Sequence, residues 1–108
     1  MARAISICIP CFRDLPGLRA TISSVLAALA ETPSIQCQFA IGLNHCDFAE
    51  DDVLASFRDA GSHTFSIGKS GGYLEYDDSL RFTISHASQD VCLLMGCGDI
   101  AKPGLGLA

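Results

Sequence analysis

Short apolar runs alternate along this chain with longer stretches in which apolar residues recur every three or four positions. The runs at 4–9, 36–43, 63–67 and 91–95 predict strands, because they are short and either alternate or are apolar throughout. The stretches at 14–31, 47–57 and 77–87 predict helices. Strands that alternate with helices form parallel sheets. The pattern therefore predicts an α/β fold with a mainly parallel sheet.

Several element ends have recognisable signals. Asp14 is expected to cap the first helix, with Pro16 in its first turn. Pro10 has no N–H for a sheet ladder and is expected to end the first strand. Asp47 and Glu50 have the spacing of a capping box before the second helix.

The same pattern predicts which faces are buried. The first helix should bury an apolar stripe, and the third should bury Leu80, Ile84 and Ala87. The unbroken run 91–95 is typical of a strand buried on both faces, which would place Cys92 in the core. The stripe of the first helix is formed by Leu18, Ile22, Val25, Leu26 and Leu29.

Composition narrows the class of protein. The 108 residues are 49% hydrophobic with a mean hydropathy of +0.34, enough for one domain with a real core. A net charge of −5 argues against nucleic acid as a main partner. The most apolar helical stretch, 20–30, is too short to span a bilayer, and 1–10 makes a poor signal peptide. A cytoplasmic protein is expected, and its six cysteines are then interpreted as thiols.

The turn after the last strand is the first candidate site. Gly96 and Gly98 allow a sharp turn, and Asp99 follows as a lone carboxylate. In open α/β sheets, ligands bind at the carboxyl ends of strands where the strand order reverses. A role for Asp99 in shaping the turn is equally open.

Two further motifs have weaker functional interpretations. Cys8 and Cys11 form a CxxC, but residues three apart in a strand point to opposite faces, so buried thiols are favoured over a thioredoxin-like pair. Lys69 lies in a sequence that ends like a P-loop, but His63 stands where that motif needs glycine. A lysine in such a glycine-rich loop could reach a phosphate or be an ordinary surface residue.

Four segments in order resemble the amino-terminal half of family-2 glycosyltransferases, which have the GT-A fold. Residues 5–13 resemble the family's opening strand, which ends Ile-Pro-x-Tyr/Phe-Asn, and 23–26 its first-helix segment. Residues 39–47 resemble its second strand and the following loop, and 87–104 the stretch that carries its acidic motif before Pro-Gly. The resemblance implies a three-layer, Rossmann-like sheet, truncated here, with strand order 3-2-1-4 and a ligand crevice between strands one and four.

The resemblance also implies a ligand and its contacts. The family binds a nucleoside-diphosphate sugar with a divalent metal, Mn²⁺ or Mg²⁺, and Asp99 matches the last metal-binding carboxylate. Cys97 and Gly98 stand where the family has acids, and Leu43 where it has a base-contacting Asp. The implied nucleotide contacts are Pro10, Cys11, Phe12, Arg13 (in place of the family's Asn) and Asn44, with Lys69 added from its loop.

These observations give three hypotheses. The first is that the chain is the nucleotide-sugar-binding part of a glycosyltransferase. This part has no candidate catalytic base and is expected to be inactive alone. It would contact a membrane only if its sugar acceptor is lipid-linked. The second is a thioredoxin-like protein that uses Cys8 and Cys11. The third is a non-catalytic remnant or assembly module of the same fold. A half-domain should expose apolar surface, so self-association or marginal stability is expected.

Overall fold

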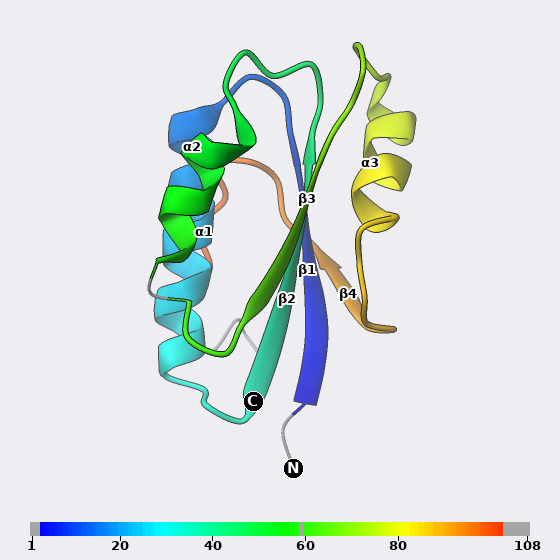
Figure 1. The fold of residues 1–108 in the computed structure, drawn as a ribbon. Helices are drawn as coiled ribbons and strands as arrows, with labels where there is room; N and C mark the ends of the chain where they lie inside the picture. Colours follow the sequence, from blue (N-terminus) through cyan, green and yellow to red (C-terminus); the bar gives the residue numbers. More distant parts are fainter. Residues whose placement is uncertain (1–2, 59, 103–108) are drawn as a thin grey trace.

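The predicted α/β fold with a parallel sheet is confirmed. The structure, a computed structural model, describes residues 3–58 and 60–102. Its elements, shown in Figure 1, are β1 (Arg3–Cys11), α1 (Leu15–Ala30), β2 (Ile35–Leu43), α2 (Glu50–Leu54), the 3₁₀ turn η1 (Ala55–Phe57), β3 (Thr64–Lys69), α3 (Tyr76–Ile84) and β4 (Cys92–Leu94). Residues 103–104, the end of the fourth resembling segment, lie outside the described ranges.

The four strands form one sheet in the order β3-β2-β1-β4, and all neighbours are parallel. The predicted strand order is confirmed. Helices α1 and α2 cover one face of the sheet and α3 covers the other (Figure 1). The chain moves from β1 outward to β3 and then returns to the opposite side of β1, so the strand order reverses between β1 and β4.

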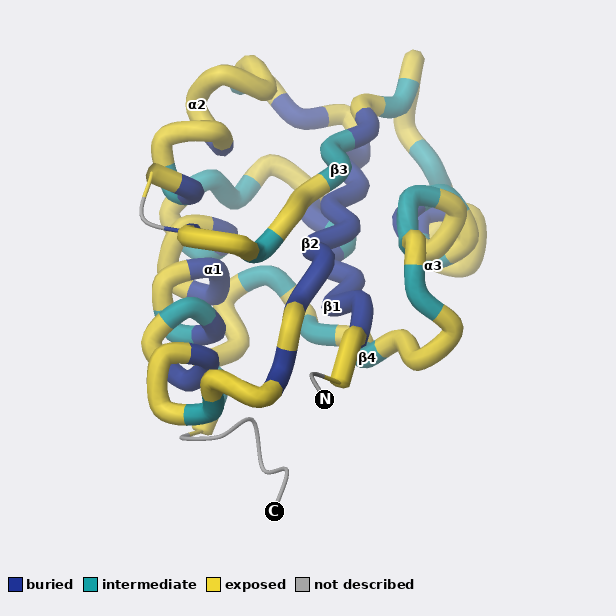
Figure 2. The backbone as a smooth tube through the Cα atoms, turned by 60° about the horizontal axis from the view of Figure 1, so that its bottom comes forward, coloured by how far each residue is buried: buried dark blue, intermediate teal, exposed yellow. Residues whose placement is uncertain are grey.

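The apolar core lies between the sheet and α1. Alternation in β1 sends the odd-numbered isoleucines toward α1, where they meet the helix's apolar stripe. Figure 2 shows the central strands buried and the outer helix surfaces exposed. The fully buried side chains of this layer include Ile7, Ile9, Leu18, Ile22, Val25, Phe39 and Ile41.

The face under α3 is polar, contrary to the predicted apolar packing. Ser6 Oγ donates to Gln38 Oε1 at 2.6 Å, and both side chains are buried. Helix α3 buries Ser79 and Thr83, whereas Ile84 is exposed and the other two predicted residues, Leu80 and Ala87, are half-buried. The sheet face beneath presents small and polar residues, so it accepts the helix's small polar side rather than its larger apolar side chains.

Pro10 does not end β1, which continues to Cys11. Ser6 and Cys8 make their backbone hydrogen bonds to the β4 side, at Val91 and Met95. By the same alternation, the nitrogen of Pro10 points to that side beyond the last paired residue of β4. No ladder bond is needed there, so proline is tolerated.

The two predicted helix caps have different outcomes. Asp14 caps α1 as predicted, with its Oδ1 accepting from the Gly17 N–H at 2.9 Å. The capping box predicted for Asp47 and Glu50 is wrong, because α2 begins at Glu50. The Asp52 carboxylate instead accepts from the Ala49 N–H at 3.0 Å.

β4 is an edge strand, not the strand buried on both faces that its apolar run predicted. It has three residues, pairs only with β1 and lies at one edge of the sheet within the described ranges. Cys92 and Leu94 are exposed and Leu93 is half-buried, so the predicted core position of Cys92 is also wrong. No described helix combines the length and apolar character needed to cross a membrane.

Candidate functional site

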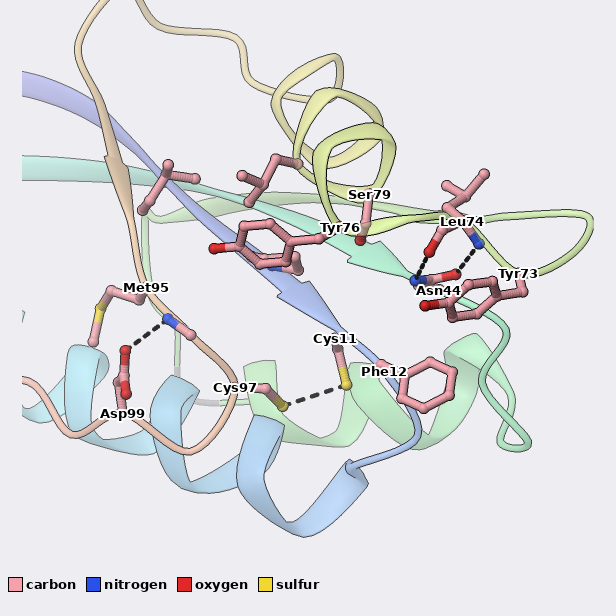
Figure 3. A pocket seen from close by; sticks show the side chains of 14 residues that line it. Cys11, Phe12, Asn44, Tyr73, Leu74, Tyr76, Ser79, Met95, Cys97 and Asp99 are labelled. Carbon is pink, nitrogen blue, oxygen red and sulfur yellow. Dashed lines mark hydrogen bonds between the residues drawn. The ribbon is translucent and has the colours of Figure 1, made fainter.

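A pocket of about 540 Å³ lies at the carboxyl ends of β1 and β4, where the strand order reverses. Ligands of open α/β sheets bind at such switch points. Figure 3 shows the pocket between the strand ends, α3 and the loop that precedes α3. Its lining residues are Pro10, Cys11, Phe12, Asn44, Tyr73, Leu74, Tyr76, Ser79, Leu80, Leu94, Met95, Gly96, Cys97 and Asp99.

Phe12 and Tyr73 form an aromatic wall of the pocket, and Tyr76 lines the pocket apart from them (Figure 3). Phe12 follows β1, Tyr73 lies in the loop after β3, and Tyr76 begins α3. The rings of Phe12 and Tyr73 meet edge to face, with centroids 5.6 Å apart (Figure 3). They are 51% and 59% exposed, and Tyr76 is 73% exposed, so flat apolar surface remains open to a ligand. Such surface favours a planar group.

Asn44 holds the pocket's loop in place. Its Nδ2 donates to the Leu74 carbonyl at 2.9 Å, and its Oδ1 accepts from the Leu74 N–H at 2.8 Å (Figure 3). Asn44 itself is buried. The amide thus joins the end of β2 to the segment that carries Tyr73 and Tyr76, and in this structure it positions the aromatic wall.

Asp99 shapes the turn after β4 and also lines the pocket. Its N–H donates to the Gly96 carbonyl at 3.0 Å, and its Oδ2 accepts from the Gly96 N–H at 2.7 Å (Figure 3). Gly98 has a φ of +99°, which glycine adopts most readily at this place in a turn. The structural role is therefore present, and the carboxylate is exposed at the same time.

The described residues contain no group of three or more His, Cys, Asp or Glu side chains placed to hold a metal ion. Asp99 is the single acidic residue that lines the pocket. Its neighbours Cys97 and Gly98 supply no carboxylate. These residues do not form a divalent-cation site by themselves, since hard cations take several oxygen ligands.

Arg13 and Lys69 do not line the pocket. Arg13 donates from Nε to the His45 carbonyl at 3.0 Å, and its guanidinium carbon lies 5.9 Å from the centroid of the Phe12 ring. It therefore stands beside the aromatic wall. Lys69 ends β3 and donates from Nζ to the Phe48 carbonyl at 3.2 Å. That contact directs its ammonium toward the loop before α2.

Cys8 and Cys11 both lie in β1, and neither is at a helix start. Burial, together with Cys92, raises the pKa of the Cys8 thiol to about 11. The hydrogen bond with Cys97, together with burial, raises the pKa of Cys11. A redox CxxC needs a thiol with a lowered pKa, so this arrangement lacks the usual activation.

Five of the seven predicted site residues meet in one pocket: Pro10, Cys11, Phe12, Asn44 and Asp99. The prediction missed Tyr73 and Tyr76. The sequence feature that could have indicated them is their position: two aromatic residues follow Gly71-Gly72, between the end of a predicted strand and the start of a predicted helix.

Comparison of the chain with protein-family models, with curated proteins and with solved structures found no match.

Proposed function

We propose that the pocket at the β1/β4 switch point binds the nucleoside diphosphate of a nucleotide sugar. The chain would then be the nucleotide-sugar-binding part of a glycosyltransferase with the GT-A fold. One observation carries the proposal: five of the seven residues assigned to nucleotide and metal contacts come from three separate segments and line one pocket. They are Pro10 and Cys11 at the end of β1, Phe12 directly after it, Asn44 after β2, and Asp99 after β4.

The aromatic wall suits the nucleoside. Phe12 and Tyr73 present exposed ring surface at the pocket, and a base stacks on such surface. The Arg13 guanidinium beside Phe12 adds positive charge at the same rim. Asn44 contributes by holding the loop that carries Tyr73, rather than by contacting the ligand directly.

The diphosphate end of the ligand would lie toward Asp99. A diphosphate and a carboxylate repel one another, so a divalent cation is expected between them. Asp99 could serve as one protein ligand of an ion that the phosphates hold mainly, as Mg²⁺ is often held. The lone carboxylate also suits the alternative that this is a non-catalytic remnant of the same fold, in which binding has lapsed.

The test is a thermal-unfolding titration with uridine diphosphate and the other nucleoside diphosphates, each with and without Mn²⁺. A ligand that binds only the folded chain raises the melting temperature, by about 10 °C when it is present at about 100 times its Kd. We expect a nucleotide shift that Mn²⁺ enlarges, and Asp99→Ala should lose the Mn²⁺-dependent part. Asp51→Ala removes an exposed carboxylate of α2 that does not line the pocket and should leave the shift unchanged.

Phe12→Ala separates the two ends of the site. It should weaken the shift for every nucleotide, with and without Mn²⁺, because it removes ring surface and not charge. A folded chain that no nucleoside diphosphate stabilises would overturn the proposal and favour the remnant.

A further inference from the structure

Two cysteines that lie far apart in sequence meet at the edge of the pocket. Cys97 Sγ lies 3.3 Å from Cys11 Sγ, across 86 positions of sequence (Figure 3). Both sulfurs also lie within hydrogen-bond distance of the same acceptor, the Asp14 carbonyl oxygen, 3.2 Å from Cys97 Sγ and 3.6 Å from Cys11 Sγ. The shared contact keeps the two sulfurs beside each other at the start of α1.

The surroundings of the pair allow a bond to form. A disulfide needs its sulfurs at about 2.0 Å, so the two must approach by little more than an ångström. Cys97 lies between Gly96 and Gly98 in an exposed turn, and glycines let a backbone adjust with little steric cost. Cys11 is buried at the end of β1 and provides a fixed partner.

We propose that Cys11 and Cys97 are a redox-modification site, which forms an intramolecular disulfide on exchange with a small-molecule disulfide such as oxidised glutathione. Cys97 is the half-exposed member, so the reagent meets it first. Its sulfur gives up a proton and attacks the reagent, forming a mixed disulfide and releasing one glutathione. In the mixed disulfide Cys97 has no S–H, so its hydrogen bond with Cys11 is lost. Cys11 then gives up its proton, attacks the Cys97 sulfur and displaces the second glutathione. Two protein thiols lose two electrons, and one glutathione disulfide becomes two thiols.

The other thiols are less suited to this reaction. Cys46 is buried, donates to the Cys11 carbonyl at 3.4 Å and accepts from the Arg13 N–H at 3.3 Å. Cys92 is exposed, but its thiol donates to the Gln89 carbonyl at 3.4 Å. Cys92 and Cys8 both lie in paired strands, β4 and β1, so neither backbone can adjust as the turn at Cys97 can. Cys92 is therefore the main competitor, and the experiment must separate the two pairs.

The bond would join the end of β1 to the turn that carries Asp99. Both partners line the pocket, so oxidation would fix one of its walls. Formation of the disulfide requires only the two thiols, whatever ligand the pocket binds.

The test treats the reduced, folded chain with oxidised glutathione, alkylates the remaining thiols after denaturation and measures the intact mass. We expect the loss of two of the six thiols with no glutathione retained, and full reversal by dithiothreitol. Cys8 and Cys11 lie three residues apart, so fragmentation spectra of the linked peptides must distinguish them. The double variant Cys8→Ser/Cys92→Ser removes the competing pair and should still form the bond.

Cys97→Ser is the decisive single variant, because the turn is exposed and the change leaves the buried Cys11 in place. It should abolish the intramolecular bond, whereas Cys46→Ser should retain it. The oxidised wild type should melt at least about 5 °C above the reduced form, because closing so long a loop restricts the unfolded chain. A stable mixed disulfide on Cys97, a bond between Cys8 and Cys92, or no loss of thiols would each overturn the proposal.

Discussion

His63 contributes a ring nitrogen to the sheet. Its Nδ1 accepts from the Cys37 N–H at 3.0 Å, just before β3 begins. An Nδ1 that accepts a hydrogen bond carries no proton, so protonation of the ring would break this contact. Burial lowers the pKa of His63 from its ordinary value of 6.5.

The pKa shift of His63 predicts how stability depends on pH. The unfolded chain binds the proton at higher pH than the folded chain does, so the free energy of unfolding should fall as pH drops through 6.5 toward the lower folded pKa. Above pH 6.5 both states are neutral at this residue and the contribution is fully present. Urea unfolding at pH 7.5 and at pH 5.5 measures the loss. His63→Gln keeps an acceptor and removes the titration, so it should lose less stability over this interval; an equal loss would contradict the assignment.

Site residues were predictable where the backbone alone places them. Pro10, Cys11 and Phe12 end or directly follow β1, so a prediction of that strand was enough to bring them to the sheet edge, although the predicted end at Pro10 was wrong. Tyr73 depends on the pair of hydrogen bonds between Asn44 and Leu74, which joins residues 30 positions apart. No local pattern encodes that contact, and the sequence interpretation therefore missed the aromatic wall.

Helix α3 shows how a neighbouring element decides which face of a helix is buried. Its apolar positions predicted a face of Leu80, Ile84 and Ala87, but Thr83 lies over Gly42 of β2 and is fully buried. His86, just after the helix, lies over Gly68 of β3 in the same way. Glycines in the sheet let the helix approach closely, and this requirement is visible only when strand and helix are placed together.

The close approach of α3 predicts a cost for adding one methyl group to the sheet. A Cβ at Gly42 would overlap the Thr83 side chain and lie 3.1 Å from its Cα. Gly42→Ala should therefore destabilise the fold by about 1–3 kcal/mol, because α3 must shift. Gly71→Ala is the matched control: nothing lies within 4 Å of its added Cβ, so its effect should stay within about 0.5 kcal/mol.

Urea unfolding of both glycine variants measures these differences. The double variant Gly42→Ala/Thr83→Ala should recover part of the loss, because the clashing side chain is gone. Equal effects of Gly42→Ala and Gly71→Ala would mean that α3 does not rest on this glycine.

At the scale of the molecule, the order of the strands was predictable and the burial of β4 was not. The returning connection places β4 beside β1, whichever residues it contains. An apolar run is common to a central strand and to an edge strand whose outer side is exposed. Val91 and Leu94 are each 53% exposed, so the run 91–95 is of the exposed, edge-strand type.

The exposed edge predicts that the chain associates with itself. Within the described ranges, β4 has β1 on one side and no strand on the other. An unpaired strand edge with apolar side chains is a template for pairing with another chain. Sedimentation velocity over a broad range of concentrations should show a monomer that gives way to a larger species.

Val91→Lys tests whether the β4 edge is responsible for that association. Val91 lies directly before β4. A lysine at the end of an edge strand opposes pairing with another chain, so this variant should remain monomeric at concentrations where the wild type associates. Val91 uses its backbone carbonyl, not its side chain, to pair with Ser6, so the fold should tolerate the change. Leu54→Lys replaces an exposed apolar residue of α2 and should leave association unchanged.

If the wild type is monomeric at every concentration and melts sharply at high temperature, the edge does not recruit a second chain. Its exposed apolar residues would then be compatible with a stable, isolated fold.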